Sequence, residues 1–525
     1  MREALWSAQM IVACIANLKN AAVIPAATRA IRPSVLPRAP PDANGCVVSA
    51  DAGVRLTCRR RQDAMSAIRI VAALLAGVAL AGCASLPHLQ DVEDAAAARP
   101  ATPLRIVGPD GLLMPEYRAE LERRLKGGSS DGLLGRQLEV MQAVTDGSLV
   151  AGNATTILVD GPQAYMAMLA AIEGARDHVH IESFIFEDLD FGQRLGDLLV
   201  AKQAAGVAIS VLYDSFGSIA TPRAFFDRLR GAGVHVCEFN PLNPLRATVA
   251  WRLNHRDHRK IVVVDGMAAF TGGINFHRVY RTGSAGLLRR SMPTIDEGWR
   301  DTHLAIRGPA VSEFQRLFIT SWDKQRCEPL PAREFFPPLG AEGDTVVSVI
   351  GSSPDSMENR MYLTLVSALT RAQRSIYLTT AYFAPDPNTI AALTGAAARG
   401  VDVRLLLPGI TDSWLVLHAG RSHYATLLAG GVRIYERHDV LLHAKTAVID
   451  GVWSTIGSSN TDWRSFGQND EVNAVVLGEP FGVQMTRLFF DDLAAAREIE
   501  REAWEARGAQ ARLREWFARR WEHLL

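Results

Sequence analysis

The sequence predicts an α/β protein made of two similar halves. Strand-like apolar runs alternate with longer helix-like stretches, and this alternation is typical of βαβ units around a largely buried sheet. Hydrophobic residues make up 48% of the chain, which is enough for well-packed cores. The length of 525 residues favours two large domains with extensions over one domain.

Each half contains three strand-like runs in the same order, separated by helical stretches. The matched runs are residues 179–186, 209–213 and 234–236 in the first half and 376–383, 403–407 and 432–434 in the second. A Pro-rich segment at 335–338 lies between the halves. We therefore expect each half to be an α/β sandwich, the first at residues 150–335 and the second at 340–500.

The motif H-x-K-x4-D occurs once in each half. Its members are His258, Lys260 and Asp265 in the first copy and His443, Lys445 and Asp450 in the second. Because alternate side chains of a strand share a face, each His lies beside its Lys and the pair can reach one ligand. The Asp of each copy completes this catalytic motif, but its side chain lies on the opposite face of the strand from the His and Lys. It also begins an Asp-Gly hairpin turn, so we expect a structural role for it.

Each motif is followed by a cluster of small residues that ends in Asn. The first cluster ends at Asn275 and the second at Asn460. A single H-x-K-x4-D is a weak pattern that an ordinary strand edge with a solvated lysine also produces. Two copies of the motif, each followed by such a cluster, indicate that the chain carries the same phosphate-binding half-site twice.

These residue types suit the cleavage and transfer of a phosphodiester. One imidazole attacks phosphorus and forms a covalent phosphohistidine, while the other protonates the departing alcohol. The second His then acts as general base for an incoming alcohol or water. The two lysines, with Asn275 and Asn460, supply donors to the non-bridging oxygens, whose charge must be stabilised in the transition state.

We expect neither a metal nor an organic cofactor. The sequence contains no H-E-x-x-H motif, no paired C-x-x-C and no acidic calcium loop. The formal net charge is zero, whereas a nuclease would usually present a basic surface to its substrate. The balanced charge therefore disfavours a nuclease function, although it does not exclude a local basic patch.

The two motifs resemble those of the phospholipase D superfamily, in which two copies build one active site. Over residues 150–500 the chain is most similar to bacterial cardiolipin synthases. The resemblance implies two tandem phospholipase D-like α/β sandwich domains that share one active site at their interface. The second copy carries that family's N-x-D-x-R-S-x-x-x-N-x-E arrangement, formed by Asn460, Asp462, Arg464, Ser465, Asn469 and Glu471.

The resemblance also implies that a downstream carboxylate orients each catalytic His. By position, we expect Glu471 to orient His443 and Asp301 to orient His258, fixing the tautomer of each ring and stabilising its imidazolium form. The acidic pair at 296–297 is an alternative to Asp301, and a surface role for Asp301 is another.

The activity implied is phosphatidyl transfer, which joins two phosphatidylglycerols into cardiolipin and releases glycerol. By family analogy His258 is the nucleophile and His443 the general acid. The expected partners are phospholipids, including phosphatidylethanolamine as another donor, and a membrane, without nucleic acid. The alternatives are a phospholipase D that passes the intermediate to water, a metal-independent nuclease, and an inactive lipid-binding lipoprotein.

The start of the chain predicts a lipoprotein leader at residues 65–82. A short basic segment precedes an apolar run at 70–80, which fits a signal peptide and is too short for a membrane span. The run ends in Leu-Ala-Gly-Cys, which resembles the lipobox of bacterial lipoproteins and implies lipidation of Cys83. We expect translation to begin at Met65, so that residues 1–64 are absent from the mature protein.

The mature protein would then be a periplasm-facing lipoprotein. Ala84 resembles the residue of lipoproteins sorted to the outer membrane, whereas cardiolipin synthases are usually placed at the inner membrane, and the sequence leaves the two membranes open. Residues 83–149 would form an N-terminal extension. Cys237 and Cys327 are the other cysteines of the mature chain, and the sequence leaves their pairing open.

The last segment, residues 501–525, is rich in arginine and tryptophan. A helix of this composition suits a membrane interface, and capping of the preceding domain is the alternative.

Overall fold

The computed structural model describes residues 46–49, 55–58, 86, 106–109, 111–112, 149–247, 249, 251–252, 254–284, 297–355 and 359–525. The chain divides into two compact units, Met1–Ala84 and Ser85–Leu525. In the first unit, β1 (Cys46–Ser49) and β2 (Arg55–Cys58) pair in antiparallel fashion. The predicted leader at 65–82, Cys83 and most of the predicted extension lie outside the described residues.

The first half is a mixed sheet whose parallel strands lie at one side. The order is β8 (His235–Phe239), β7 (Ala208–Asp214), β6 (His178–Ser183), β10 (Lys260–Val264), β11 (Ala268–Gly272), β12 (Thr302–Arg307) and β5 (Leu149–Val159). Strands β6 to β8 run parallel and the others antiparallel to their neighbours. Both β6 and β7 are buried along their whole length, as expected for strands covered on two faces.

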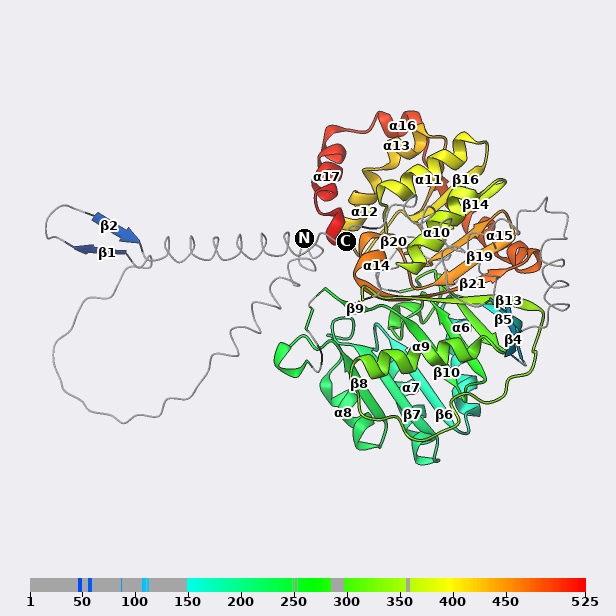
Figure 1. Cartoon of the computed structure of the whole chain (residues 1–525). Helices are drawn as coiled ribbons and strands as arrows, with labels where there is room; N and C mark the ends of the chain where they lie inside the picture. Colours follow the sequence, from blue (N-terminus) through cyan, green and yellow to red (C-terminus); the bar gives the residue numbers. More distant parts are fainter. Residues whose placement is uncertain are drawn as a thin grey trace. The chain divides into compact units, whose positions relative to one another are not determined.

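The second half, whose strands between residues 375 and 477 run from yellow to orange in Figure 1, repeats this order strand for strand. The order is β17 (Arg433–Arg437), β16 (Asp402–Pro408), β14 (Ser375–Thr379), β18 (Thr446–Ile449), β19 (Trp453–Gly457), β21 (Asn469–Leu477) and β13 (Thr345–Ser352). A short edge strand, β22 (Ala496–Glu498), extends the sheet beyond β17. The repeated order confirms the predicted fold class of two like α/β halves.

Helices pack against both sheets. In the first half they are α6 (Asp160–Gly174), α7 (Phe191–Ala204), α8 (Arg223–Gly231) and α9 (Val311–Lys324). In the second half they are α10 (Arg360–Arg371), α11 (Pro387–Ala398), α12 (Trp414–Arg421), α13 (Tyr424–Ala429), α14 (Trp463–Gly467) and α15 (Glu479–Leu493). Within the described residues, no helix is both long and apolar enough to cross a bilayer.

The chain after β22 forms two helices rather than the one expected from its composition. They are α16 (Arg501–Glu505) and α17 (Ala509–Arg519), and a short 3-10 turn, η4 (Glu522–Leu524), follows. Gly508 caps the start of α17 and separates the two helices. Glycine at this position interrupts the helical pattern that composition alone suggests.

The two halves are joined by backbone pairing and by a shared apolar core. Strands β5 and β13 pair in antiparallel fashion, which links the two sheets. On β10, Val262 and Val264 face the core of the first half, whereas Ile261 and Val263 face a cluster that also contains side chains of β18, β19 and β21. One face of β10, the first motif strand, therefore lies at the junction of the halves. Both halves lie in one compact unit, so the bounds 150–335 and 340–500 remain predictions.

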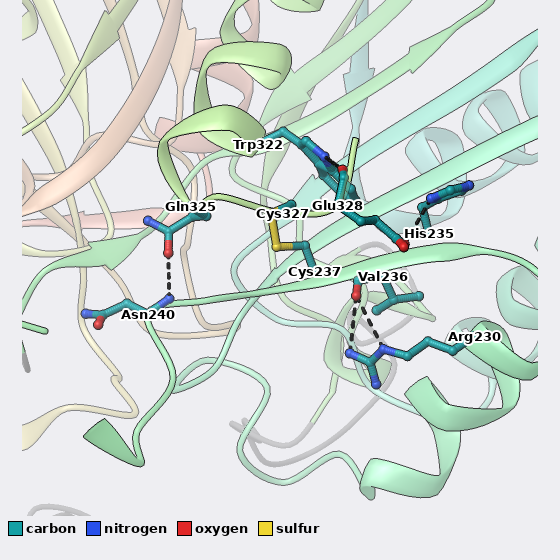
Figure 2. The surroundings of a disulfide bond; sticks show 9 residues. All are labelled: Arg230, His235, Val236, Cys237, Asn240, Trp322, Gln325, Cys327 and Glu328. Carbon is teal, nitrogen blue, oxygen red and sulfur yellow. Dashed lines mark hydrogen bonds and ion pairs between the residues drawn. A yellow bond between two sulfur atoms is a disulfide. The ribbon is translucent and has the colours of Figure 1, made fainter. Parts of the chain in front are cut away.

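A disulfide between Cys237 and Cys327 ties β8 to the segment that follows α9 (Figure 2). The two residues are 90 positions apart in the sequence. Beside the bond, Trp322 donates through Nε1 to the carbonyl of Glu328 at 2.7 Å, and the backbone N–H of Asn240 donates to Gln325 at 3.1 Å. The structure thus answers the question of pairing that the sequence left open.

Candidate active site

Both motif histidines lie where a motif strand begins. His258 stands between a short strand, β9 (Arg256–Asp257), and Lys260, the first residue of β10. In the second copy, Lys445 directly precedes β18 and His443 lies two residues earlier. All four side chains are buried.

The backbone before each His pairs with the opposite half of the molecule. Strand β9 of the first half runs parallel to the start of β21, and Leu442 of the second half forms a bridge with Arg300 of the first. The backbone N–H of His258 donates to the carbonyl of Asp470 at 2.9 Å, and that of His443 donates to the carbonyl of Arg300 at 2.7 Å. Each accepting carbonyl belongs to the residue directly before a buried carboxylate.

These two carboxylates orient the histidines across the junction, which corrects the predicted assignment. His258 Nδ1 lies 3.0 Å from both oxygens of Glu471, and His443 Nδ1 lies 2.7 Å from Asp301 Oδ2. The expectation that each carboxylate serves the His of its own half was wrong. Sequence order shows only that a carboxylate lies downstream, whereas the pairing of β9 with β21 brings Glu471 to the other half.

Burial dominates the electrostatics of the two histidines. It lowers the pKa of His258 to about 4, although Glu471 acts in the opposite direction. It also lowers the pKa of His443 well below its usual value, and Lys445 adds to this effect. Both imidazoles are therefore neutral near pH 7 in the unliganded site. Because a carboxylate accepts from each Nδ1, the Nδ1 atoms carry the protons, and Nε2 of His443 accepts from Lys445 Nζ at 3.0 Å.

The two orienting carboxylates differ in their proton affinity. Burial raises the pKa of Asp301 to about 6, and Lys445 opposes this shift. Burial also acts to raise the pKa of Glu471, but His258, Lys260 and Ser458 together outweigh it and the net shift is downward. The carboxylate beside His258 is thus firmly ionised, whereas the one beside His443 titrates close to neutrality.

The two lysines are buried beside their own histidines. Burial lowers the pKa of Lys260 to about 7 and that of Lys445 to about 8. Lys260 Nζ donates to the carbonyl of His258 at 2.6 Å, and Lys445 Nζ bonds with the carbonyl and ring of His443. An anion entering the site would favour the charged form of both amines, because an opposite charge nearby favours ionisation.

The clusters of small residues lie against the carboxylates. A Cβ at Gly273 would lie 2.1 Å from Asp301 Oδ1, so the carboxylate occupies space that any side chain would need. At the matching position of the second copy, Ser458 donates through Oγ to Glu471. Asn275 and Asn460, which end the clusters, are both buried. In the described part of the chain, Asn460 Oδ1 has no hydrogen-bond partner.

Both motif aspartates lie at the far ends of their strands from the histidines. Asp265 accepts from the backbone N–H groups of 176–178, and Asp450 accepts from those of 373–375. Each has a left-handed backbone, with φ of 52° and 56°, in the turn that ends its strand. Asp265 is five positions after Lys260, a rise of about 16 Å along a strand. This placement supports a structural role for both.

Four aromatic side chains that the sequence did not single out surround the histidines. The hydroxyl oxygen of Tyr280 lies 2.9 Å from His443 Nδ1, and the ring of Trp299 lies 5.1 Å from that of His443. Phe184 lies 5.0 Å from the ring of His258, and Tyr382 lies 6.0 Å from that of His443. Phe184 and Tyr382 closely follow β6 and β14, the parallel strands beside the motif strands. Their position in the sequence, just after a parallel strand, could have identified them as site residues, since ligands often bind beyond the carboxyl ends of parallel strands.

Arg259, the middle residue of the first motif, is also part of the junction. Its guanidinium donates to Ser321 on α9 at 2.6 Å, to the carbonyl of Ser352 on β13 at 2.9 Å, and to the carbonyl of Glu471 at 3.1 Å. The matching residue of the second copy is Ala444, so this anchor exists in one copy alone. It fixes the backbone that carries Glu471.

Comparisons with known proteins agree with this duplicated site. Residues 168–297 and 365–493 each match a family model described as "Cardiolipin synthase, PLD-like domain". Cardiolipin synthase 1 of Bacillus anthracis is 34% identical over 391 residues, which cover 73% of this chain and 74% of that protein. Cardiolipin synthase of Geobacillus kaustophilus (strain HTA426) is 35% identical over 370 residues, covering 70% of this chain and 71% of that protein.

Among solved structures, phosphatidylserine synthase of Haemophilus influenzae Rd KW20 has a similar fold. The TM-score is 0.53 at 11% identity, and the match covers 74% of this chain and 100% of the other. At this identity the likeness supports the fold alone.

Proposed function

Because the chain belongs to the cardiolipin synthase family of phospholipase D-superfamily phosphatidyltransferases, we propose that it joins two phosphatidylglycerols into cardiolipin and releases glycerol. The observation that carries the proposal is the pair of buried histidines at one junction, each oriented by a carboxylate of the opposite half. Two imidazoles held in this way can divide nucleophilic attack and proton transfer between them.

In the first step, His258 Nε2 attacks phosphorus and a P–N bond forms. The bond from phosphorus to the glycerol oxygen breaks, and that oxygen takes a proton from His443 Nε2. His443 gains this proton from solvent when the phosphate anion enters the site, because a negative charge nearby favours the imidazolium form. Ionised Glu471 stabilises the positive charge that develops on the His258 ring. The lowered pKa of Glu471 supports His258 as the nucleophile, because its partner keeps a full negative charge.

In the second step, His443 removes the proton from a hydroxyl of a second phosphatidylglycerol. The resulting oxygen attacks phosphorus, the P–N bond breaks, and His258 is restored. Asp301, whose pKa lies at about 6, suits the His that must gain a proton in one step and lose it in the other. Phosphatidylethanolamine is a second donor with the same phosphodiester.

We assign the stabilisation of the phosphate to Lys260, Lys445, Asn275 and Asn460. Each lysine is desolvated, so its charge acts strongly on an anion brought close to it. The aromatic side chains around the histidines favour a lipid alcohol over water as the acceptor. That preference would separate a transferase from a phospholipase D with the same intermediate.

We also propose that the enzyme works outside the cytoplasm, attached to a membrane through lipidated Cys83 after cleavage of a leader at 65–82. The disulfide between Cys237 and Cys327 supports this location, because disulfides persist in oxidising compartments such as the bacterial periplasm. Mass spectrometry of the membrane-bound form tests the anchor. Recovery of peptides from residues 1–64, or of unmodified Cys83, would contradict it.

The function is tested with phosphatidylglycerol as the only lipid, in the presence of EDTA. We expect release of glycerol and accumulation of cardiolipin, because lysines and asparagines are proposed to hold the phosphate. Phosphatidic acid as the main product would support the phospholipase alternative. Cleavage of single-stranded DNA with lipid left intact would support the nuclease, and lipid binding without turnover would support an inactive binding protein.

A further inference from the structure

Helix α17 carries its apolar side chains on its outer face. Leu513, Trp516 and Phe517 are 64%, 56% and 48% exposed, and their spacing places them on one side of the helix. The opposite side contains Glu515 and Ala518, which are buried. A helix on the surface of a soluble domain normally has the reverse arrangement, with its apolar face towards the core.

A tryptophan of a neighbouring helix extends this apolar surface. Trp414, the first residue of α12, is partly exposed, and its ring lies 6.5 Å from that of Phe517. We call Trp414, Leu513, Trp516 and Phe517 the α12–α17 patch. Helices α12 and α17 lie side by side in Figure 1 and pack against each other.

The exposed charges on α17 and its C-cap are positive. Four arginines of α17 and its C-cap are exposed, namely Arg512, Arg514, Arg519 and Arg520. The guanidinium of Arg520 lies 5.0 Å from the ring centre of Trp516. The acidic residue of this helix, Glu515, is buried and bound by Arg507. An aromatic face flanked by arginines is complementary to the interface of an anionic phospholipid bilayer.

Contacts along the chain connect both ends of the patch with the active site. The backbone N–H of Arg464, close to Asn460, donates to the carbonyl of Leu525 at 2.7 Å. Just before α12, Asp412 accepts from the hydroxyl of Tyr382, whose ring lies beside that of His443. The helices that carry the patch are therefore tied to segments that reach the second half-site.

We propose that the α12–α17 patch docks the enzyme on a bilayer that contains anionic phospholipid. Leu513, Trp516 and Phe517 enter the interface between headgroups and acyl chains, while the flanking arginines contact lipid phosphates. The proposal rests on the proposed function, because it takes membrane phospholipid as the substrate, and it names the surface that meets that lipid.

Photo-crosslinking from the patch tests this directly. Benzoylphenylalanine is placed at Leu513 in the full chain with Cys83→Ser, so that no lipid anchor contributes. The matched control places it at Val483 on α15, which is 58% exposed. With vesicles of phosphatidylcholine and phosphatidylglycerol, we expect lipid adducts from position 513 and few from position 483. Equal yields from both positions, or adducts between two copies of the chain, would overturn the proposal.

A charge variant measures the electrostatic part. The double variant Arg512→Gln, Arg519→Gln should need about 30-fold more phosphatidylglycerol vesicle for half-maximal adduct at position 513, since each arginine near the surface contributes about fivefold. The control, Arg194→Gln with Arg316→Gln, removes two exposed arginines elsewhere and should leave this concentration unchanged. A similar change in both variants would contradict the assignment.

Failure of docking and failure of the proposed function are distinguishable. If the crosslinker at position 513 forms lipid adducts but the wild-type enzyme makes no cardiolipin, the docking surface is supported and the proposed function is refuted. Cardiolipin synthesis without lipid adducts at position 513 would support the function and refute the docking surface.

Discussion

The crossed orientation of the histidines predicts different defects for the two carboxylate variants. Asp301→Asn removes the charged acceptor 2.7 Å from His443 Nδ1, and Glu471→Gln removes the one 3.0 Å from His258 Nδ1. If His443 is the general acid, Asp301→Asn should impair protonation of the leaving group. If His258 is the nucleophile, Glu471→Gln should impair attack on phosphorus whatever the leaving group is.

The expected magnitude follows from the proton transfer that is lost. General acid catalysis typically contributes about 10²–10⁴ in rate, which corresponds to about 3–5 kcal/mol of barrier. We therefore expect Asp301→Asn to slow cardiolipin formation from phosphatidylglycerol by about that factor. Asp301 is fully buried and hydrogen-bonded, so the isosteric amide is the mildest change that removes its charge.

The assay compares phosphatidylglycerol with a phosphatidyl ester of p-nitrophenol, whose leaving group needs no proton. The burst of nitrophenolate reports the first step alone. Asp301→Asn should retain this burst within about tenfold of wild type, because nitrophenolate leaves without a general acid. Glu471→Gln should lose the burst, because attack by His258 is impaired. Thermal unfolding of each variant controls for folding.

The opposite result would refute the reasoning. If Glu471→Gln retained the burst and Asp301→Asn lost it, His443 would be the nucleophile. If both variants kept near-native rates on both substrates, the carboxylates would not orient catalytic histidines at all.

Three further predictions concern the stability of the fold. Asp265→Asn should lower the free energy of unfolding by about 1–3 kcal/mol, because buried backbone donors lose their charged acceptor, while kcat stays near wild type. The pair Cys237→Ser, Cys327→Ser should lower it by about 4–5 kcal/mol for a 90-residue separation, and a reductant should then have no further effect on Tm. The lowered pKa of Lys260, about 7, means that the unfolded chain binds more protons above that pH; denaturant unfolding should therefore show stability rising from pH 7 towards 10, and Lys260→Met should flatten this rise.

The duplicated architecture could be predicted because it depends on local patterns. Apolar runs, Asp-Gly turns and a repeated motif are all visible in a short window of sequence, and the structure repeats the same strand order in both halves. The turn geometry of Asp265 and Asp450 follows from the same local signals, since left-handed backbone favours Asp-Gly pairs.

The partner of each His could not be predicted in the same way. Glu471 lies 28 residues after His443 in the sequence, yet it contacts His258, 213 residues away. This choice depends on how β9 pairs with β21, which is a contact between halves and leaves no local pattern. The same reason applies to Tyr280 and to Arg259, whose partners all come from other elements.

The central claim is that both half-sites serve one covalent transfer, with His258 as the nucleophile. The most direct measurement quenches the reaction with labelled phosphatidylglycerol and maps the phosphatidylated residue by mass spectrometry in wild type and in His443→Ala. We predict a phosphohistidine at His258, and its accumulation in the variant when a p-nitrophenyl substrate is used, because loss of the general base slows the second step. Label on His443, or cardiolipin formed by His258→Ala at a near-native rate, would contradict the account.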